Sequence, residues 1–352
     1  MAFITYNNVG IKAVSACVPP KKVYNKDLSY LIPEEDIEKI INSIGIRERR
    51  EAEKDVCSSD LCFKAAEQLL ANNNIDQSSI DALIFISQTP DYRQPATAMS
   101  IQHKLGLPKT TLCFDVNLAC SGYIYGLSMA FAYAQTEGIN KVLLLVGDTL
   151  SKTISSKDRS VLPLFGDAGT ATLIEKGNYP YSYFSLNSDG SESKIINIPY
   201  GGYRYPSSLK GFEKIEDGDG NIRNGEQLHM DGLEVFNFCL REVPKDIKNL
   251  LAYAKTSIED IDLIIYHQAN KYMTDLLTKK LRFSVEKTPY SISKYGNTSS
   301  ASIPLTIVDV LKDFEVYPEK NKIIMSGFGA GLSWGSVLVD LSGTKISDLV
   351  EL

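Results

Sequence analysis

The hydrophobic positions of this chain form short continuous runs that alternate with segments of helical periodicity. Continuous apolar runs are typical of strands buried on both faces, and they predict strands at Ile11–Val14, Leu83–Ser87, Thr111–Asp115, Val142–Val146, Leu263–His267 and Ile323–Ser326. Apolar residues at helical spacing predict helices over Asp60–Ala71, Ala96–Leu105, Tyr272–Arg282 and Ser300–Lys312, and another directly after Cys120. The alternation of the two patterns indicates an α/β protein.

Two strand-containing segments recur later in the chain at the same offset. SSIDALIFISQT near Ile80 is echoed by EDIDLIIYHQA near Ile261, and INKVLLLVGDT at Lys141 is echoed by KNKIIMSGFGA at Lys322, each pair 181 residues apart. A period this long does not indicate a solenoid, whose units are roughly 20–50 residues. It predicts two homologous βα-alternating halves, 1–180 and 181–352.

The stretch 201–225 is rich in glycine and charge and predicts a long loop joining the halves. Its DGDGN segment at Asp217 is similar to the start of a calcium-binding loop. Leu228 stands where such a loop needs a bidentate Glu, which favours a solvated turn.

Composition narrows the function classes. With 352 residues, 43% of them hydrophobic and 23% charged, the chain has the composition of a soluble globular protein of one large or two packed units. The net charge of −6 argues against a nucleic-acid binder. No apolar run approaches the roughly 20 residues of a membrane span, and the N-terminus lacks a secretory-signal pattern. The six cysteines form no CxxC pairs, so we expect a reducing cytoplasm.

Cys120 is the first candidate for chemistry. It lies in VNLACSGYIYGL, between an apolar strand-like run and the start of a hydrophobic helix. A helix N-terminus carries partial positive charge and unpaired N–H groups, which stabilise a thiolate and lower the pKa of a cysteine. A small buried core residue is an equally good interpretation of a cysteine at this junction. The local pattern leaves both open.

Of the three histidines, His267 is the strongest candidate, because it ends the predicted strand in DLIIYHQAN, at the edge where α/β folds place their chemistry. His103 lies within a predicted helix and His229 near a helix start, without a recognisable catalytic neighbour. Asn297, in YGNTSSAS, maps by the 181-residue offset close to Cys120. If the halves pack about a pseudo-twofold axis, the two helix starts meet at a shared site; otherwise Asn297 is a helix cap.

Four segments carry a family resemblance. They are ACSG with Cys120, HQAN with His267, GNTSSAS with Asn297, and the glycine-rich turn GFGAGLSWG between two predicted strands. Together they resemble the β-ketoacyl-acyl-carrier-protein synthase III family of the thiolase fold. Three further segments agree in the same order, GIRER, DR and FGDAGTA, beginning at Gly45, Asp158 and Phe165. The resemblance covers nearly the whole chain and implies a five-layered αβαβα fold, a cytoplasmic homodimer, and an acyltransferase that needs no cofactor or metal.

The resemblance also implies a role for each residue. Cys120, as a thiolate, attacks an acyl thioester and holds the acyl group covalently. Backbone N–H groups of Cys120 and Ala330 form the oxyanion hole, with Ala330 standing where the family has a glycine. A malonyl thioester then loses CO₂, and His267 and Asn297 donate hydrogen bonds to the resulting enolate. The carbanion attacks the acyl group and gives a β-ketoacyl product, while Phe328 shapes the site.

Departures from the family pattern concern the primer and its carrier. Lys39 and Ser43 stand where acyl-CoA-primed members have a Trp and an Arg around the adenine of coenzyme A, and the only Trp is Trp334. Arg159 is retained and is expected to pair with a phosphate. An acyl carrier protein is therefore a candidate first donor beside acyl-CoA. Gln94 replaces a Phe that often closes the acyl pocket across the dimer, which indicates a primer other than acetyl, for a fatty-acid, polyketide or surface-polysaccharide pathway.

A carrier protein is acidic and requires a basic docking patch on its partner. The helix after HQAN offers the candidates Lys271, Lys279, Lys280 and Arg282. A solvated helix face is the alternative interpretation. A second basic cluster, Arg47, Arg49 and Arg50, lies in and after GIRER, and we expect structural ion pairs there.

Other functions fit less well. A cysteine-protease triad is rejected because the repeat and the glycine turn fit the thiolase fold. Relatives that transfer acyl groups to alcohols or amines usually alter the His and Asn positions, which are intact here. Condensation without decarboxylation, as in hydroxymethylglutaryl-CoA synthase, needs an added carboxylate base that the sequence does not identify. A non-catalytic partner of another synthase would lack the nucleophilic cysteine.

Overall fold

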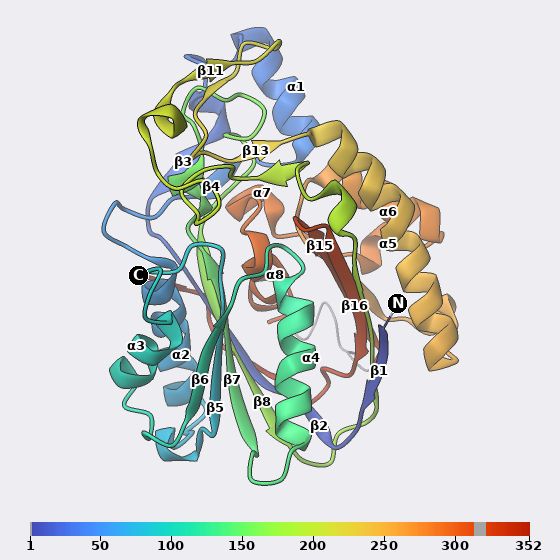
Figure 1. Cartoon of the computed structure of the whole chain (residues 1–352). Helices are drawn as coiled ribbons and strands as arrows, with labels where there is room; N and C mark the ends of the chain where they lie inside the picture. The colour runs from blue at the N-terminus through green and yellow to red at the C-terminus, as the bar shows by residue number, and fades with distance from the viewer. Residues whose placement is uncertain (1, 313–321) are drawn as a thin grey trace.

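Two β-sheets stacked between layers of helices make up the protein (Figure 1). The computed structural model describes residues 2–312 and 322–352. Helices α2 (Ser58–Asn72) and α3 (Thr97–Lys104) cover the outer face of the first sheet, and α5 (Gly232–Ala254) and α6 (Lys271–Leu281) lie outside the second. Helices α4 (Gly122–Gln135) and α8 (Ser302–Val310) lie between the sheets. This five-layered αβαβα arrangement confirms the expected thiolase-like fold.

The first sheet has the strand order β17-β2-β8-β7-β5-β6, and β18 also pairs with β2. Its strands are β2 (Val9–Val18), β5 (Ala82–Ile86), β6 (Leu112–Val116), β7 (Lys141–Asp148), β8 (Ala168–Lys176), β17 (Lys345–Ile346) and β18 (Val350–Glu351). The β5 strand pairs in parallel with β6 and β7, and β8 is antiparallel to β7 and β2. Parallel pairing requires crossover helices, and α3 and α4 supply them.

The second sheet has the order β1-β9-β16-β15-β14. Its strands are β1 (Ala2–Tyr6), β9 (Ser182–Ser188), β14 (Leu263–Tyr266), β15 (Ile323–Gly329) and β16 (Ser333–Val339). The first strand of the chain thus belongs to the second sheet, and β17 and β18 from the end of the sequence belong to the first. Each sheet borrows strands from the other half, so the division into 1–180 and 181–352 stays a prediction.

The central helices are apolar on all sides because a sheet covers each face. The main hydrophobic core includes Tyr123, Leu127 and Phe131 of α4 together with Ile303 and Ile307 of α8. These side chains contact strands of both sheets, so the central layer joins the two halves into one core.

All the strands and helices expected from periodicity are present, with shifted ends. The pattern missed α5, which has Pro244 in its interior, where proline normally breaks a helix. It also missed α1 (Glu34–Ile44), β9, and β8, whose first residues belong to the FGDAGTA motif although no strand was expected there. Among the described residues, no helix is long and apolar enough to cross a membrane.

Smaller elements form a cap at the upper end of the molecule in Figure 1. They comprise β3 (Lys22–Tyr24), β4 (Glu48–Arg50), β10 (Ile196–Asn197), β11 (Ile215–Glu216), β12 (Ile222–Arg223), β13 (His229–Met230) and α7 (Ile292–Tyr295). The segment 201–225, expected as a loop joining the halves, contains the hairpin β11–β12 and lies between β9 and α5, both in the second half. Its turn is closed by the Asp217 carboxylate, which accepts hydrogen bonds from the backbone N–H groups of Asp219 and Asn221.

Candidate active site

Cys120 lies in the turn between β6 and the N-terminus of α4. The glycine-rich strand β15 passes directly against it. A Cβ atom added to Gly329 would lie 2.8 Å from Cys120 Cβ and 3.1 Å from Sγ, so a side chain has no room at this position. On the other side of Cys120, the Ser121 Oγ lies 2.7 Å from Ser333 Oγ, which in turn donates to the Ala330 carbonyl at 3.0 Å. These contacts fix the start of α4 against the glycine turn.

His267 follows the last residue of β14 and is buried. Its backbone N–H donates to the Ser326 carbonyl at 2.8 Å, which continues the pairing of β14 with β15. Its Nδ1 lies 2.7 Å from Ser302 Oγ at the start of α8, and the Phe328 ring packs edge-on, 5.4 Å between centroids. Burial lowers the pKa of His267 to about 3, so the ring is neutral at physiological pH.

Asn297 is held by the segment that carries the FGDAGTA motif. Its backbone N–H donates to the Leu164 carbonyl at 2.8 Å, and its carbonyl accepts from Gly166 at 3.1 Å, forming an isolated parallel bridge with Phe165. Its side-chain Oδ1 accepts from the Ser299 N–H at 2.9 Å. With the oxygen engaged inside the loop, the Nδ2 group is the part of the amide available to a ligand.

The predicted residues share one cavity of about 250 Å³. Cys120, His267, Asn297, Phe328 and Ala330 all line it, so the structure brings the expected catalytic set together. Much of the remaining wall is apolar and includes Leu150, Leu164, Phe165, Ile196, Leu228 and Met230. Among the described residues, no group of three His, Cys, Asp or Glu is arranged to hold a metal ion.

Sequence reasoning missed three polar residues behind Cys120. Ser299 places its Oγ 3.7 Å from Cys120 Sγ and accepts from Gln88 Nε2 at 2.9 Å. Asp148, at the end of β7, accepts from the Gln88 backbone N–H at 2.7 Å and from the Ser87 hydroxyl at 3.1 Å. Ser299 lies two residues after Asn297 in the GNTSSAS segment, so the sequence could have suggested it as a site residue. Gln88 and Asp148 belong to no recognised motif.

Electrostatics around the thiol oppose its ionisation in the resting site. Burial raises the pKa of the Cys120 thiol to about 12, the hydrogen bond with Ser299 lowers it, and the negative charge of Asp148 raises it further. The helix N-terminus predicted to activate Cys120 is present, but the enclosed position dominates. The thiol therefore needs a proton acceptor before it can attack.

Comparison with known proteins identifies the family. Residues 114–190 match the family model described as 3-oxoacyl-[acyl-carrier-protein] synthase III, and residues 251–341 match the model of its C-terminal part. The chain is 35% identical over 340 residues to a putative 3-oxoacyl-[acyl-carrier-protein] synthase 3 of Campylobacter jejuni, covering 95% of this chain and 94% of that protein. The chain belongs to the 3-oxoacyl-[acyl-carrier-protein] synthase III family.

Solved structures agree with this assignment. A 3-oxoacyl-(acyl-carrier protein) synthase of Burkholderia xenovorans superposes with a TM-score of 0.92 at 39% identity, covering 100% of this chain and 99% of that one. A priming β-ketosynthase from the R1128 polyketide pathway superposes with a TM-score of 0.81 at 27% identity, covering 95% of this chain and 96% of that one. The protein is thus a condensing enzyme of the acyltransferase type.

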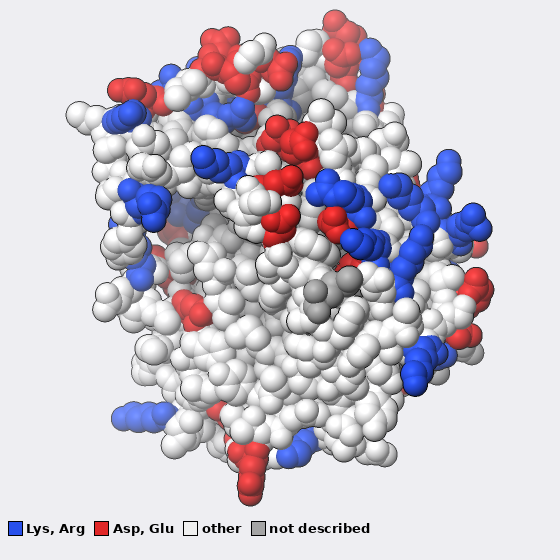
Figure 2. Space-filling view, turned by 45° about the vertical axis from the view of Figure 1, so that its right-hand side comes forward, with Lys and Arg blue, Asp and Glu red and all other residues white. Residues whose placement is uncertain are grey.

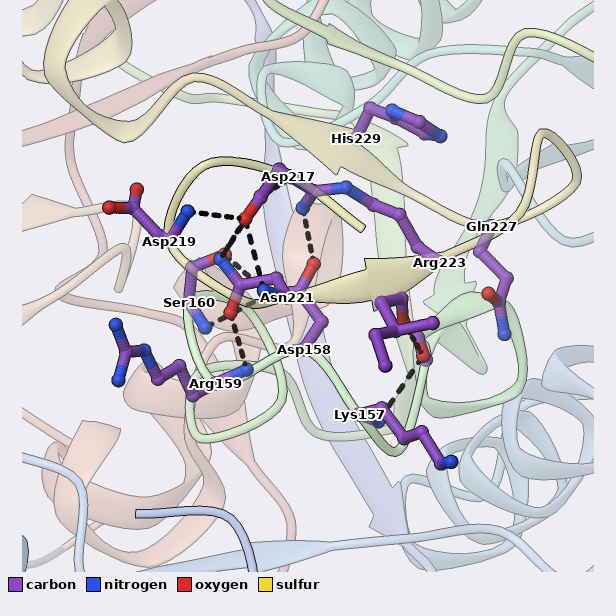
Figure 3. Close-up of polar contacts among 12 residues, drawn as sticks. Lys157, Asp158, Arg159, Ser160, Asp217, Asp219, Asn221, Arg223, Gln227 and His229 are labelled. Atoms are coloured by element: carbon purple, nitrogen blue, oxygen red, sulfur yellow. Dashed lines mark hydrogen bonds and ion pairs between the residues drawn. The ribbon is translucent and has the colours of Figure 1, made fainter. Parts of the chain in front are cut away.

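The residues of the DR motif, Asp158 and Arg159, connect the β11–β12 hairpin of the cap to the rest of the molecule. Figure 3 shows that Asp158 and Asp217 both pair with the guanidinium of Arg223, while the Arg159 backbone N–H donates to Asn221 Oδ1 at 3.1 Å. Asp158 is buried, so the ion pair ties the β11–β12 hairpin to the segment at the cavity edge. The Arg159 side chain extends away from this cluster (Figure 3).

Arg159 shares a second cavity with the two departing positions, Lys39 and Ser43 of α1. Their sequence neighbours Ile44 and Ser160 line the catalytic cavity, so the second cavity lies beside it. Lys39 is paired with Asp36 at 2.8 Å, and within the described residues no aromatic ring lines this second cavity. Trp334 is elsewhere, packed against Phe238 with ring centroids 5.3 Å apart.

Gln94 is exposed and does not line the catalytic cavity of its own chain. The docking candidates lie on and just after α6: Lys279, Lys280 and Arg282 are exposed, while Lys271 pairs with Asp275 at 2.6 Å. The structure adds three exposed cations from α5 to the same side of the molecule, Arg241, Lys245 and Lys248. We call Lys279, Lys280 and these three the basic surface.

Of the three arginines in and after GIRER, Arg49 and Arg50 form the expected ion pairs, whereas Arg47 forms none within the described residues. Arg49 is buried and donates to Glu51 at 3.0 Å, to Asn25 at 3.0 Å and to the Phe165 carbonyl at 3.1 Å. Arg50 pairs with Glu351 at 2.7 Å. Phe165 forms an isolated β-bridge with Asn297, so the hydrogen bond from Arg49 to the Phe165 carbonyl helps to hold the loop that carries Asn297.

Proposed function

We propose that this protein catalyses a decarboxylative Claisen condensation. Cys120 takes up an acyl group from a thioester and then transfers it to the carbanion formed from a malonyl thioester, which we assign to an acyl carrier protein. The observation that carries the proposal is the convergence of Cys120, His267 and Asn297 from three separate segments on one buried cavity.

Acyl loading needs a nucleophile and an oxyanion site. Attack of the Cys120 thiolate on the thioester carbonyl creates a tetrahedral oxyanion and expels the carrier thiolate. The backbone N–H groups of Cys120 and Ala330 are the donors proposed for this oxyanion. The bare Gly329 allows the two segments to approach closely enough for both donors to reach one oxygen.

Decarboxylation needs neutral donors at the thioester oxygen of the malonyl group. Ser302 Oγ accepts from the Gln268 N–H at 3.3 Å, so its own hydrogen is available to the Nδ1 of His267. This arrangement selects the neutral tautomer that carries its proton on Nε2. Nε2 of His267 and Nδ2 of Asn297 then stabilise the enolate, and the carbanion attacks the acyl-cysteine.

The cavity favours an aliphatic primer carried by a protein. Its largely apolar wall suits an alkyl chain, since burial contributes about 25 cal/mol per Å² of apolar surface. In the second cavity beside it, Arg159 is suited to a phosphate, while Lys39 and Ser43 offer no ring to stack on adenine. We therefore assign the first donor to an acyl carrier protein, whose phosphopantetheine carries the phosphate.

The basic surface is the proposed docking site for that carrier. Figure 1 places α5 and α6 on its right, and Figure 2 turns that side toward the viewer; Lys and Arg side chains gather in the right half of this view. Five cations from two adjacent helices offer an acidic partner a broad complementary field despite the net negative charge of the chain.

We further propose a homodimer formed through β6. This strand is the outer strand of the first sheet in the described residues, and Leu112 is 41% exposed while Phe114 and Val116 are only half-buried. An apolar unpaired edge is a template for pairing with a second copy. Gln94, which is exposed in one copy, then acts across the interface.

Intact-protein mass spectrometry tests the function. The enzyme is mixed with acyl-CoA and acyl-carrier-protein thioesters of several chain lengths, beside Cys120→Ala, and release of CO₂ is followed after malonyl-carrier protein is added. We expect an adduct on native protein alone, from carrier-bound acyl groups, followed by CO₂ release. Loading without CO₂ release would replace the proposal with a non-decarboxylating acyl transfer, and no loading from either carrier would refute it.

A further inference from the structure

The proposed function leaves open which group accepts the proton of the Cys120 thiol. Burial raises the pKa of this thiol to about 12 and lowers the pKa of His267 to about 3, so the imidazole is a weak acceptor. Cys120 is only partly exposed, in the wall of the cavity. If its thiol lost the proton to bulk water, a second negative charge would stand beside Asp148, at a high cost in a low-dielectric site. An acceptor within the cavity wall would avoid this.

The hydroxyl of Ser299 is the nearest polar partner of the thiol. Its Oγ lies 3.7 Å from Cys120 Sγ, within hydrogen-bond range for sulfur, and accepts from Gln88 Nε2 at 2.9 Å. A serine hydroxyl accepts two hydrogen bonds and donates one. When the thiol and the Gln88 amide donate, both acceptor sites are filled, and the hydroxyl hydrogen is left for a third partner.

The Asp148 carboxylate is the candidate for that third partner, since hydrogen bonding from Ser299 lowers the pKa of its carboxyl. The same Gln88 Nε2 lies 3.4 Å from Asp148 Oδ2, and Ser300 Oγ donates to Oδ2 at 3.3 Å, so the carboxylate and Ser299 surround one amide group. Asp148 is fully buried. Burial raises the pKa of the Asp148 carboxyl, and hydrogen bonds from Gln88, Ser299 and Ser87 lower it.

Ser299 is held in place by its backbone. Its φ is +53°, in the left-handed region that non-glycine residues rarely adopt, and its N–H donates to Asn297 Oδ1 at 2.9 Å. Such a conformation persists only where the surroundings impose it, and it is enriched at functional sites. Here the hydroxyl contacts the Cys120 thiol and the Gln88 amide that also reaches Asp148.

We propose that Ser299 and Asp148 form a proton relay that activates Cys120, an inference that rests on the proposed function. The S–H bond breaks and its proton passes to Ser299 Oγ, while the hydroxyl proton of Ser299 passes to the Asp148 carboxylate. The negative charge moves from the carboxylate to Sγ, and the total charge of the site is unchanged. When the thiolate expels the carrier thiolate from the thioester, the proton returns along the same path to the leaving sulfur.

The relay predicts an unusual pH profile for the reactivity of Cys120. If Asp148 takes the thiol proton, the reactive ion pair is a tautomer of the resting state, and its population does not depend on pH between the two pKa values. Without the relay, thiolate forms only by loss of a proton to water, so reactivity rises about tenfold per pH unit below the thiol pKa. The other titratable groups that face these two residues are His267, Cys239 of α5 and Cys62 of α2.

Alkylation by iodoacetamide at about pH 7 to 9, with Cys120 quantified by peptide mass spectrometry, measures this profile. We expect a plateau for the wild type and a unit slope for both Asp148→Asn and Ser299→Ala. Thr298→Val is the matched control: it removes a hydroxyl of the same buried loop that has no hydrogen-bond partner among the described residues, and it should keep the plateau.

The outcomes separate the relay from simple electrostatics. Loss of the Asp148 charge alone would lower the thiol pKa, so an Asp148→Asn variant that alkylates faster than wild type would overturn the proposal, as would a unit slope in the wild type. If Asp148→Asn does not fold, Ser299→Ala still tests the proposal, because it removes the hydroxyl that passes the proton from Cys120 to Asp148. Iodoacetamide is not a substrate, so a plateau without acyl loading would refute the proposed function while leaving the relay intact.

Discussion

Adding one methyl group at Gly329 tests whether the close approach of β15 to Cys120 is essential. In Gly329→Ala, the new Cβ would lie 2.8 Å from Cys120 Cβ, whereas carbon atoms in contact lie about 3.5–4.0 Å apart. One of the two segments must therefore move by roughly 1 Å. Overpacking of this kind typically costs about 1–3 kcal/mol of unfolding free energy. A misplacement of about 1 Å at a reacting atom costs about 100-fold in rate.

The assay compares the rate of acyl loading onto Cys120, measured by intact-protein mass spectrometry, with stability measured by urea denaturation. Gly343→Ala is the matched control, because nothing lies within 4 Å of a Cβ atom at that glycine. We expect slow loading and reduced stability for Gly329→Ala and neither effect for the control. Wild-type loading and wild-type stability in Gly329→Ala would show that the packing argument is wrong.

Four further predictions concern stability, assembly and docking. Arg49→Met leaves Glu51 and the Phe165 carbonyl without their buried partner and should lower the unfolding free energy by about 3–5 kcal/mol in urea denaturation. Burial holds the pKa of His267 near 3, against about 6.5 in the unfolded chain, so the unfolded state binds more protons between these values. The unfolding free energy should therefore decrease as the pH is lowered below about 6.5, by up to about 1.4 kcal/mol per pH unit relative to His267→Gln. Urea titrations at several pH values would show this. Leu112→Arg should convert a dimer to a monomer in sedimentation experiments, and an unchanged mass would contradict pairing through β6. Lys279→Glu should raise the KM for malonyl-carrier protein about 3- to 10-fold without changing that for malonyl-pantetheine, while exposed Lys109→Glu should change neither.

The sequence predicted the elements whose environment is uniform along their length. The strand at Val142–Val146 is buried on both faces, so a continuous apolar run describes it fully. Helix α5 is different, because Pro244 interrupts the local pattern and its helical state depends on packing against β15 and β16. The strands β1 and β17 also depend on distant partners, β9 in the middle of the sequence and β2 near its start, which periodicity cannot reveal.

The site was predictable as far as it rests on local motifs. Cys120, His267 and Asn297 each stand in a recognisable segment, and the 181-residue repeat indicated that two of them meet. The network beside the thiol was not predictable, because Ser299 and Asp148 are far apart in the sequence. They come close only when the short 3-10 helix that begins at Ser299 packs against the end of β7. Its hydrogen-bond pattern depends on the distances among Gln88, Ser299 and Asp148, which no spacing in the sequence encodes.

The exchange of strands between the sheets bears on how the protein is made. As the chain leaves the ribosome, β2 emerges long before its partners β17 and β18, and Glu351 pairs with Arg50, which is also made much earlier. The first half alone would expose one edge of β2, and the second half alone would lack β1 beside β9. Folding that proceeds from the N-terminus during synthesis therefore leaves the first sheet incomplete until β17 and β18 have been made. Expression of the two halves as separate fragments should give a working cavity only when both are present together.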